Sequence, residues 1–181
     1  DCGTIYTDVN FFLLLSSIEN SNDYLKYNIV VDDLIELYNS RNVFKKNYSN
    51  LNSAIREAVA GDIILVKSNI TLNDIVIIDK NITILAGYTE LKPTDDAYAY
   101  LNGKERTVTI NRENNFSNYL FEITSDATDV NFGDAGRFSR EGYSTCKLIL
   151  TGDGKTKQES LVYVSGKLTI NSKTILENNI A

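Results

Sequence analysis

The sequence lacks histidine, methionine and tryptophan altogether, and its 181 residues include one proline and two cysteines. Without histidine the chain has no imidazole base, which excludes Ser–His–Asp and Cys–His catalytic arrangements and removes a common metal ligand. Basic side chains are also too few, at a net charge of −6, to form the positive surface that nucleic acid needs. The longest apolar stretch, residues 9–15, is too short to cross a bilayer. We therefore expect neither nucleic-acid binding nor membrane insertion.

The composition otherwise suits one ordered domain with a real core. Hydrophobic residues make up 43% of the chain and charged residues 23%. The first residue is Asp1 rather than methionine, and the last residues resemble the middle of a pattern, so we expect a fragment that continues beyond residue 181. Cys2 and Cys146 are either an extracellular disulfide closing a long loop or two unrelated thiols. Four Asn-x-Ser/Thr sequons permit glycosylation without indicating it.

Two helices are expected before residue 62. Residues 1–46 form an N-terminal segment that has no clear assignment, although residues 32–39 have the acidic start and broad apolar face of a helix. Residues 47–61 predict a second helix, which Ser49 or Asn50 can cap and Gly61 can end. Its apolar residues fall on one stripe: Leu51, Ala54, Ile55, Ala58 and Val59.

From residue 62 onward the pattern changes to short strands that repeat. Strands expected at residues 63–66 and 70–72 begin seven positions apart, and so do the pairs at 75–78 and 82–85 and at 161–164 and 168–170. Third strands are expected at 107–110, 148–150 and 174–176, and a middle set begins at 120–123 and 130–132.

Each set of three short strands is too small to bury its own apolar face, so the sets should stack. The sequence therefore predicts a right-handed parallel β-helix over residues 62–181, with about three coils and a partial first coil. The helix at 47–61 would cap its first coil, because an exposed edge invites unwanted pairing. Residues expected to alternate outward from the strands are Thr83, Thr109, Asn131 and Thr169.

Several of these stretches resemble pectin-lyase-like surface proteins. The likeness runs through residues 51–66, 69–74 and 79–84, then 115–123 and 148–154, and finally 161–170 and 174–179. These are large adhesin-like β-helix proteins on the cell surfaces of bacteria and archaea. The resemblance implies a parallel β-helix in an extracellular protein of cell adhesion. It indicates little about function, because the shared residues are strand, corner and cap positions.

Catalytic chemistry finds little support in the sequence. The outward positions carry threonine and asparagine, and Glu122 is a lone carboxylate with expected Asn or Thr neighbours. The pair Asp95–Asp96, and Asp129 with Asp134, lack the dense acidic loop of a calcium site. We therefore expect no catalytic residue, no metal site and no cofactor.

Two insertions, residues 86–106 and 133–146, concentrate aromatic and arginine side chains outside the core. Both leave after a second strand and return before a third, so they should emerge on one side and touch each other. Such residues anchor interfaces with glycans or proteins, although the insertions could instead merely cover the flank of the coils. The candidate binding residues are Tyr88, Tyr98, Tyr100, Arg137, Phe138, Arg140 and Tyr143.

Two functional hypotheses remain. The first is a non-catalytic, adhesin-like scaffold at the cell surface that binds a glycan or protein of a host or neighbouring cell. The second is a carbohydrate-active enzyme, a polysaccharide lyase or hydrolase, or its inactive relative. The second requires a cluster of carboxylates with arginine or lysine on one outer face, which we cannot build from the sequence.

Overall fold

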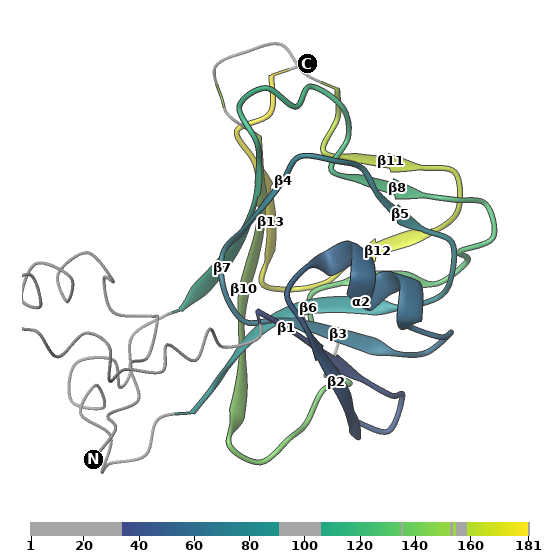
Figure 1. The fold of residues 1–181 in the computed structure, drawn as a ribbon, viewed down its shortest axis with the longest axis vertical. Helices are drawn as coiled ribbons and strands as arrows, with labels where there is room; N and C mark the ends of the chain where they lie inside the picture. The colour runs from purple at the N-terminus through teal and green to yellow at the C-terminus, as the bar shows by residue number, and fades with distance from the viewer. Residues whose placement is uncertain (1–33, 91–105, 135, 153, 155–158, 181) are drawn as a thin grey trace, which may run out of the picture.

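A computed structural model describes residues 34–90, 106–134, 136–152, 154 and 159–180 (Figure 1). An antiparallel hairpin comes first, formed by β1 (Ile35–Tyr38) and β2 (Phe44–Tyr48), and the helix α2 (Leu51–Glu57) follows it. The strands after α2 are β3 (Ile63–Val66), β4 (Ile70–Leu72), β5 (Val76–Ile78), β6 (Thr83–Thr89), β7 (Thr107–Arg112), β8 (Phe121–Ile123), β9 (Val130–Phe132), β10 (Tyr143–Thr151), β11 (Val162–Val164), β12 (Leu168–Ile170) and β13 (Thr174–Glu177).

The helix expected at residues 32–39 is wrong, because this stretch contains strand β1. All four of its residues are buried, and β1 lies between β2 and β3 with antiparallel pairing on both sides. Ile35 and Leu37 point into the main core, whereas Tyr38 belongs to a second cluster on the other face. Burial of alternate residues on opposite sides is a property of strands, whereas a surface helix buries a single stripe.

The helix expected at residues 47–61 is present but shorter. The Asn50 side chain caps it by accepting a 2.8 Å hydrogen bond from the amide of Ser53. Leu51, Ala54 and Ile55 are buried as predicted, but the helix ends at Glu57 rather than near Gly61, and Val59 is exposed.

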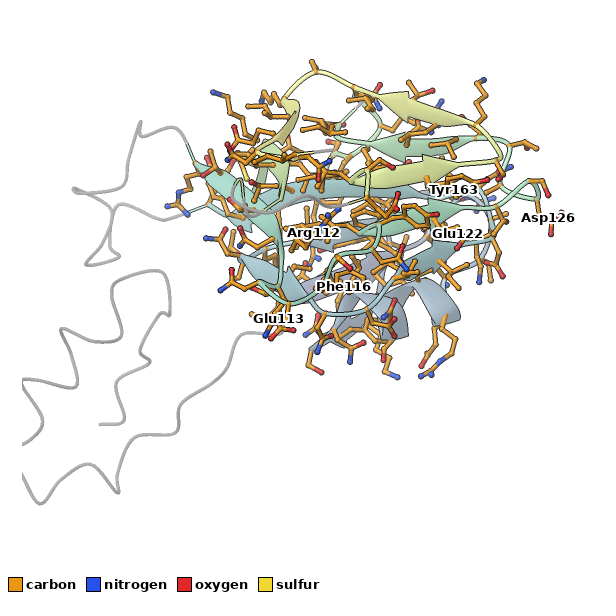
Figure 2. The ribbon with its side chains drawn as sticks, turned by 90° about the horizontal axis from the view of Figure 1, so that it is seen from above. Arg112, Glu113, Phe116, Glu122, Asp126 and Tyr163 are labelled. Carbon is orange, nitrogen blue, oxygen red and sulfur yellow. The ribbon has the colours of Figure 1, made fainter. Side chains whose placement is uncertain are left out.

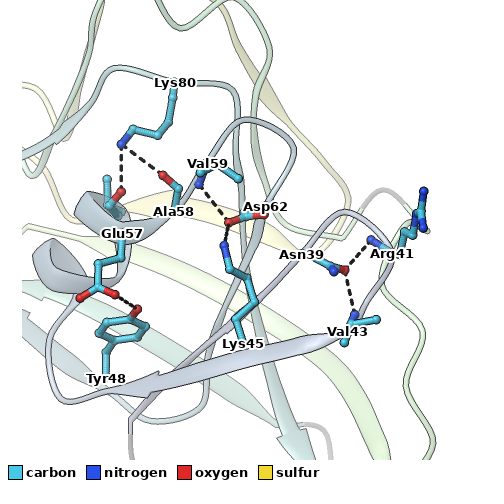
Figure 3. Close-up of polar contacts among 11 residues, drawn as sticks. Asn39, Arg41, Val43, Lys45, Tyr48, Glu57, Ala58, Val59, Asp62 and Lys80 are labelled. Carbon is cyan, nitrogen blue, oxygen red and sulfur yellow. Dashed lines mark hydrogen bonds and ion pairs between the residues drawn. The ribbon is translucent and has the colours of Figure 1, made fainter.

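Side chains from neighbouring elements fix the end of α2 (Figure 3). The ammonium group of Lys80 donates 3.3 Å hydrogen bonds to the carbonyl oxygens of Ile55 and Ala58, where the helix leaves carbonyls without partners. The hydroxyl of Tyr48 donates to the carboxylate of Glu57 at 3.0 Å. Burial raises the pKa of Tyr48 to about 12, with a further contribution from Glu57, and the same hydrogen bond lowers the pKa of Glu57.

The predicted β-helix fold is wrong. Among the described residues, ten strands belong to one large mixed sheet with the path β2-β1-β3-β6-β10-β7-β4, to which β9, β12 and β13 are joined. Only β5, β8 and β11 form a separate, small parallel sheet, which Figure 1 shows beside the large one. The protein is therefore mostly β, with a large mixed sheet and a small parallel sheet, rather than a solenoid of separate parallel faces.

Two features of the chain produce the mixed sheet. The first is the β1–β2 hairpin, which adds to β3 in antiparallel orientation. The second is the length of β6 and β10, which run past the repeating pattern and pair antiparallel through residues 86–89 and 143–146. That pairing joins strands of two parallel ladders, β3–β6–β9–β12 and β4–β7–β10–β13, into one sheet.

The main core lies between the large and the small sheet. Phe121 of β8 and Phe132 of β9 are both fully buried, and their rings meet edge to face with centroids 5.0 Å apart. β3 buries both faces, because Ile64 and Val66 point into this core while Ile63 and Leu65 belong to a second cluster.

Asparagine side chains link neighbouring strands at their ends. Asn69 accepts a 2.8 Å hydrogen bond from the amide of Thr109, and Asn81 accepts one of 2.8 Å from the amide of Asp129. Asn131 was expected to face solvent, yet it is 4% exposed and bonds to Asp129 at 3.2 Å. Thr83, its partner in the ladder, is buried as well.

Candidate binding surfaces

Two of the predicted binding residues between residues 133 and 146, Phe138 and Tyr143, pack on the outer face of the large sheet. The ring of Phe138 is 8% exposed and meets Tyr38 edge to face, with centroids 5.2 Å apart. Tyr143 packs against the same cluster, which also contains Leu65. Phe138 therefore packs over β3 and β6, in the covering role considered for the insertions, and a binding role for it stays a prediction.

Beside this cluster lies a buried carboxylate, Glu36, which is 4% exposed. Lys67 donates to it at 3.0 Å and the hydroxyl of Tyr143 at 3.3 Å, and the hydroxyl of Tyr38 also donates to it. Arg140 lies 3.9 Å from the carboxylate, and its guanidinium stacks over the Tyr143 ring at 4.3 Å. Burial raises the pKa of Tyr38, and the hydrogen bond to Glu36 adds to the shift.

This charge cluster is best explained as a structural one. The Glu36 carboxylate accepts from Tyr38 of β1, from Lys67 directly after β3 and from Tyr143 of β10, so its lone pairs are satisfied within the protein. Buried ion pairs of this kind orient the elements that supply them, and breaking one is costly. Arg140 and Tyr143 therefore attach the start of β10 to β1, and a binding role for them stays a prediction.

The two insertions touch, as predicted, where they are described. Tyr143, Ser144, Thr145 and Cys146 pair in antiparallel register with Thr89, Tyr88, Gly87 and Ala86. Arg106 lies 4.1 Å over the ring of Tyr88, so this tyrosine already has a cation partner. Tyr98 and Tyr100 lie outside the described residues. Asp95 and Asp96 lie outside them too.

Arg137 remains at the surface. Its guanidinium lies 3.9 Å from Asp129, and 60% of its side chain is exposed. Its carbonyl oxygen accepts a 3.1 Å hydrogen bond from the side chain of Asn42. Cys146 is half-buried in β10, while Cys2 lies outside the described residues, so their disulfide stays a prediction.

A different surface, which sequence reasoning missed, lies on the outer face of the small sheet. Ile77, Glu122 and Tyr163 are the middle residues of β5, β8 and β11, and the parallel register places them in one row. The neighbours of Ile77 and Glu122 in β5 and β8 point into the core, and Val162 of β11 packs against it, so the three middle residues point outward. Val164, at the end of β11, is 42% exposed. The expectation that Glu122 has Asn or Thr neighbours is wrong, since Ile77 and Tyr163 flank it. Figure 2 shows Glu122 and Tyr163 close together on adjacent strands.

A second tyrosine extends this row. The rings of Tyr119 and Tyr163 stack with centroids 5.1 Å apart and planes at 24°. Tyr163 is 46% exposed even with this partner, and Ile77 is 53% exposed. We call Ile77, Tyr119, Glu122 and Tyr163 the tyrosine face.

Buried polar contacts position the tyrosine face. The guanidinium of Arg112, at the end of β7, donates to the carbonyl oxygens of Glu159 at 3.0 Å and Ser160 at 3.1 Å, directly before β11. The amide of Glu159 also donates to the carbonyl oxygen of Ser117 at 2.9 Å. These contacts hold the segment that leads into Tyr163 against the segment that leads into Tyr119.

Within the described part of the chain, no group of three or more His, Cys, Asp or Glu residues is arranged to hold a metal ion. In the same residues, no helix is both long enough and apolar enough to span a membrane. No protein-family model matches the chain, and no curated protein or solved structure matches it either.

Proposed function

We propose that the protein is a non-catalytic recognition scaffold, exposed outside the cell or on its surface, that binds a glycan or protein of a host or neighbouring cell. The observation that carries the proposal is the tyrosine face, where Tyr163 is 46% exposed on the small sheet and its ring stacks on the half-buried Tyr119 beside it. Exposed aromatic side chains on ordered elements are typical anchors for binding, because they bury large area at little cost in side-chain entropy.

The alternative of a carbohydrate-active enzyme has less support. Hydrolysis of a glycosidic bond by the common mechanisms uses two carboxyl groups on opposite sides of the bond. On the tyrosine face the in-register neighbours of Glu122 are Ile77 and Tyr163, so no second carboxylate accompanies it in the row. The carboxylates that are buried among the described residues, Glu36 and Asp62, are already bonded by donors of the protein.

The test is binding of the fluorescently labelled full chain to intact microbial and animal cells. Binding should be saturable, and it should fall after the cells are treated with protease, which removes proteins, or with periodate, which oxidises glycans. A parallel incubation with pectin, polygalacturonate and other polysaccharides, with and without calcium, should release no new reducing or unsaturated ends. Turnover of a polysaccharide, or the lack of saturable binding to every surface, would contradict the proposal.

A further inference from the structure

We infer that the tyrosine face is a binding site for an uncharged glycan, an inference that rests on the proposed recognition function and gives its ligand a chemical class. Three properties of this face lead to the conclusion: its size, the groups it offers and its charge.

Size distinguishes a small ligand from a protein. Strands in a sheet lie about 4.8 Å apart and rise about 3.3 Å per residue, so a sheet of three strands with three residues each covers only about 140 Å². A stable protein–protein interface buries about 800 Å² on each partner. The small sheet alone is therefore several times smaller than such an interface, whereas it is large enough for one or two sugar rings.

The groups on this face suit a sugar. An aromatic ring is negative over its face, so it attracts the weakly positive C–H groups on the flat side of a pyranose. The stacked rings of Tyr119 and Tyr163 provide such a surface. Glu122 lies beside them and, within the described chain, makes no hydrogen bond or ion pair, so its oxygens can accept from sugar hydroxyls. Ile77 continues the apolar row on the other side of Glu122.

Charge disfavours an acidic glycan. The strands of the small sheet and the residues next to them carry more acidic than basic side chains. Of the basic ones, Lys80 is bonded to carbonyl oxygens at the end of α2, and Arg112 is buried against carbonyl oxygens. An anionic ligand would therefore be repelled. The carboxylates are Asp74, Asp79, Glu122, Asp126 and Glu159, and the two lysines are Lys80 and Lys167.

The experiment is isothermal titration of the full chain with uncharged hexasaccharides: cellohexaose, maltohexaose, laminarihexaose and mannohexaose. At least one should bind, with a Kd of about 1 mM or tighter. Tyr163→Ala should weaken that binding at least about tenfold, as expected for an aromatic anchor, whereas Tyr163→Phe keeps the ring and should bind within about threefold of the wild type. Hexagalacturonate, which is anionic, should bind more weakly than the uncharged sugars.

The matched control is Phe44→Ala, which removes a ring of similar exposure, 41% against 46%, from the β1–β2 hairpin. This variant should bind like the wild type. Thermal unfolding of each variant separates loss of binding from loss of folding. The inference is overturned if no uncharged hexasaccharide binds, if Tyr163→Ala binds as tightly as the wild type, or if hexagalacturonate binds best. Saturable binding to cells without any binding of uncharged sugars would refute the glycan site and leave the recognition function standing.

Discussion

The contact between Phe121 and Phe132 links the small sheet to the large one, and breaking it should be costly. Both rings are fully buried, and they come from strands of different sheets. Replacing a buried phenylalanine by alanine loses the favourable burial of the ring and leaves a cavity. Together these effects lower the free energy of unfolding by about 3–5 kcal/mol. Because a domain has only about 5–15 kcal/mol of stability, Phe121→Ala should lower the free energy of unfolding by a large fraction.

A double-mutant cycle isolates the ring contact itself. Phe121→Leu, Phe132→Leu and the double variant keep the core apolar while removing one ring or both. An edge-to-face pair of rings stabilises a protein by about 0.5–1.5 kcal/mol more than the burial of its surface area alone. The cycle should therefore give a coupling energy in that range. Urea unfolding, followed by circular dichroism and tyrosine fluorescence, measures each free energy.

The matched control lies on the opposite face of the same small sheet. Ile77 is 53% exposed, so Ile77→Ala should change the free energy of unfolding by no more than about 0.5 kcal/mol. A coupling energy near zero, or a cost of Phe121→Ala as small as that of Ile77→Ala, would refute the packing of the two sheets described above.

Three further predictions follow from individual contacts. Gly166→Ala should destabilise the fold by more than about 2 kcal/mol in urea unfolding, because a Cβ there would overlap the carbonyl oxygens of Thr124 and Ala127; a neutral effect would contradict this close approach. The pKa of Tyr48 is raised to about 12, so the stability this group provides is complete below its unfolded pKa near 10 and is lost as the pH rises to about 12. Tyr48→Phe should therefore flatten the fall in stability between those two pH values, and an unchanged pH profile would count against a raised pKa of Tyr48 in the folded protein. Asn50→Ala should cost about 1 kcal/mol through loss of the α2 cap, whereas Asn52→Ala, at an exposed position of the same helix, should cost less than half as much.

The sequence pattern located most of the short strands, because each alternates or runs apolar for three or four residues between polar turns. Strands expected at residues 63–66, 70–72, 130–132 and 168–170 have the same bounds in the structure. The pattern could not predict how they assemble. Antiparallel pairing of residues 86–89 with 143–146 depends on the direction in which two insertions leave the strands, and insertions carry no periodic signal.

Strand β1 shows a second limit of sequence reasoning. Leu34, Ile35, Leu37 and Tyr38 suit one broad face of a helix equally well, and only the neighbours β2 and β3 decide that both sides of the segment are buried. Tertiary pairing therefore overrides the local helical signal.

The tyrosine face was missed for a related reason. In β5 and β11 all three residues are apolar or aromatic, so the alternation that normally identifies the outward residue is absent. The partial signal was Glu122 between Phe121 and Ile123, which identifies the outward position of β8 and, once the register is known, of its neighbours. Aromatic residues in the insertions were a more conspicuous signal, but those at positions 138 and 143 are used for packing.

The most direct test of glycan recognition is a nuclear magnetic resonance titration of the isotope-labelled full chain with the uncharged hexasaccharide that binds best. The largest changes in amide and ring signals should come from β5, β8 and β11, centred on Tyr163 and including Tyr119 and Glu122. Changes confined to β1, β10 and the Glu36 cluster, or no change at saturating sugar, would contradict recognition of glycans by the tyrosine face.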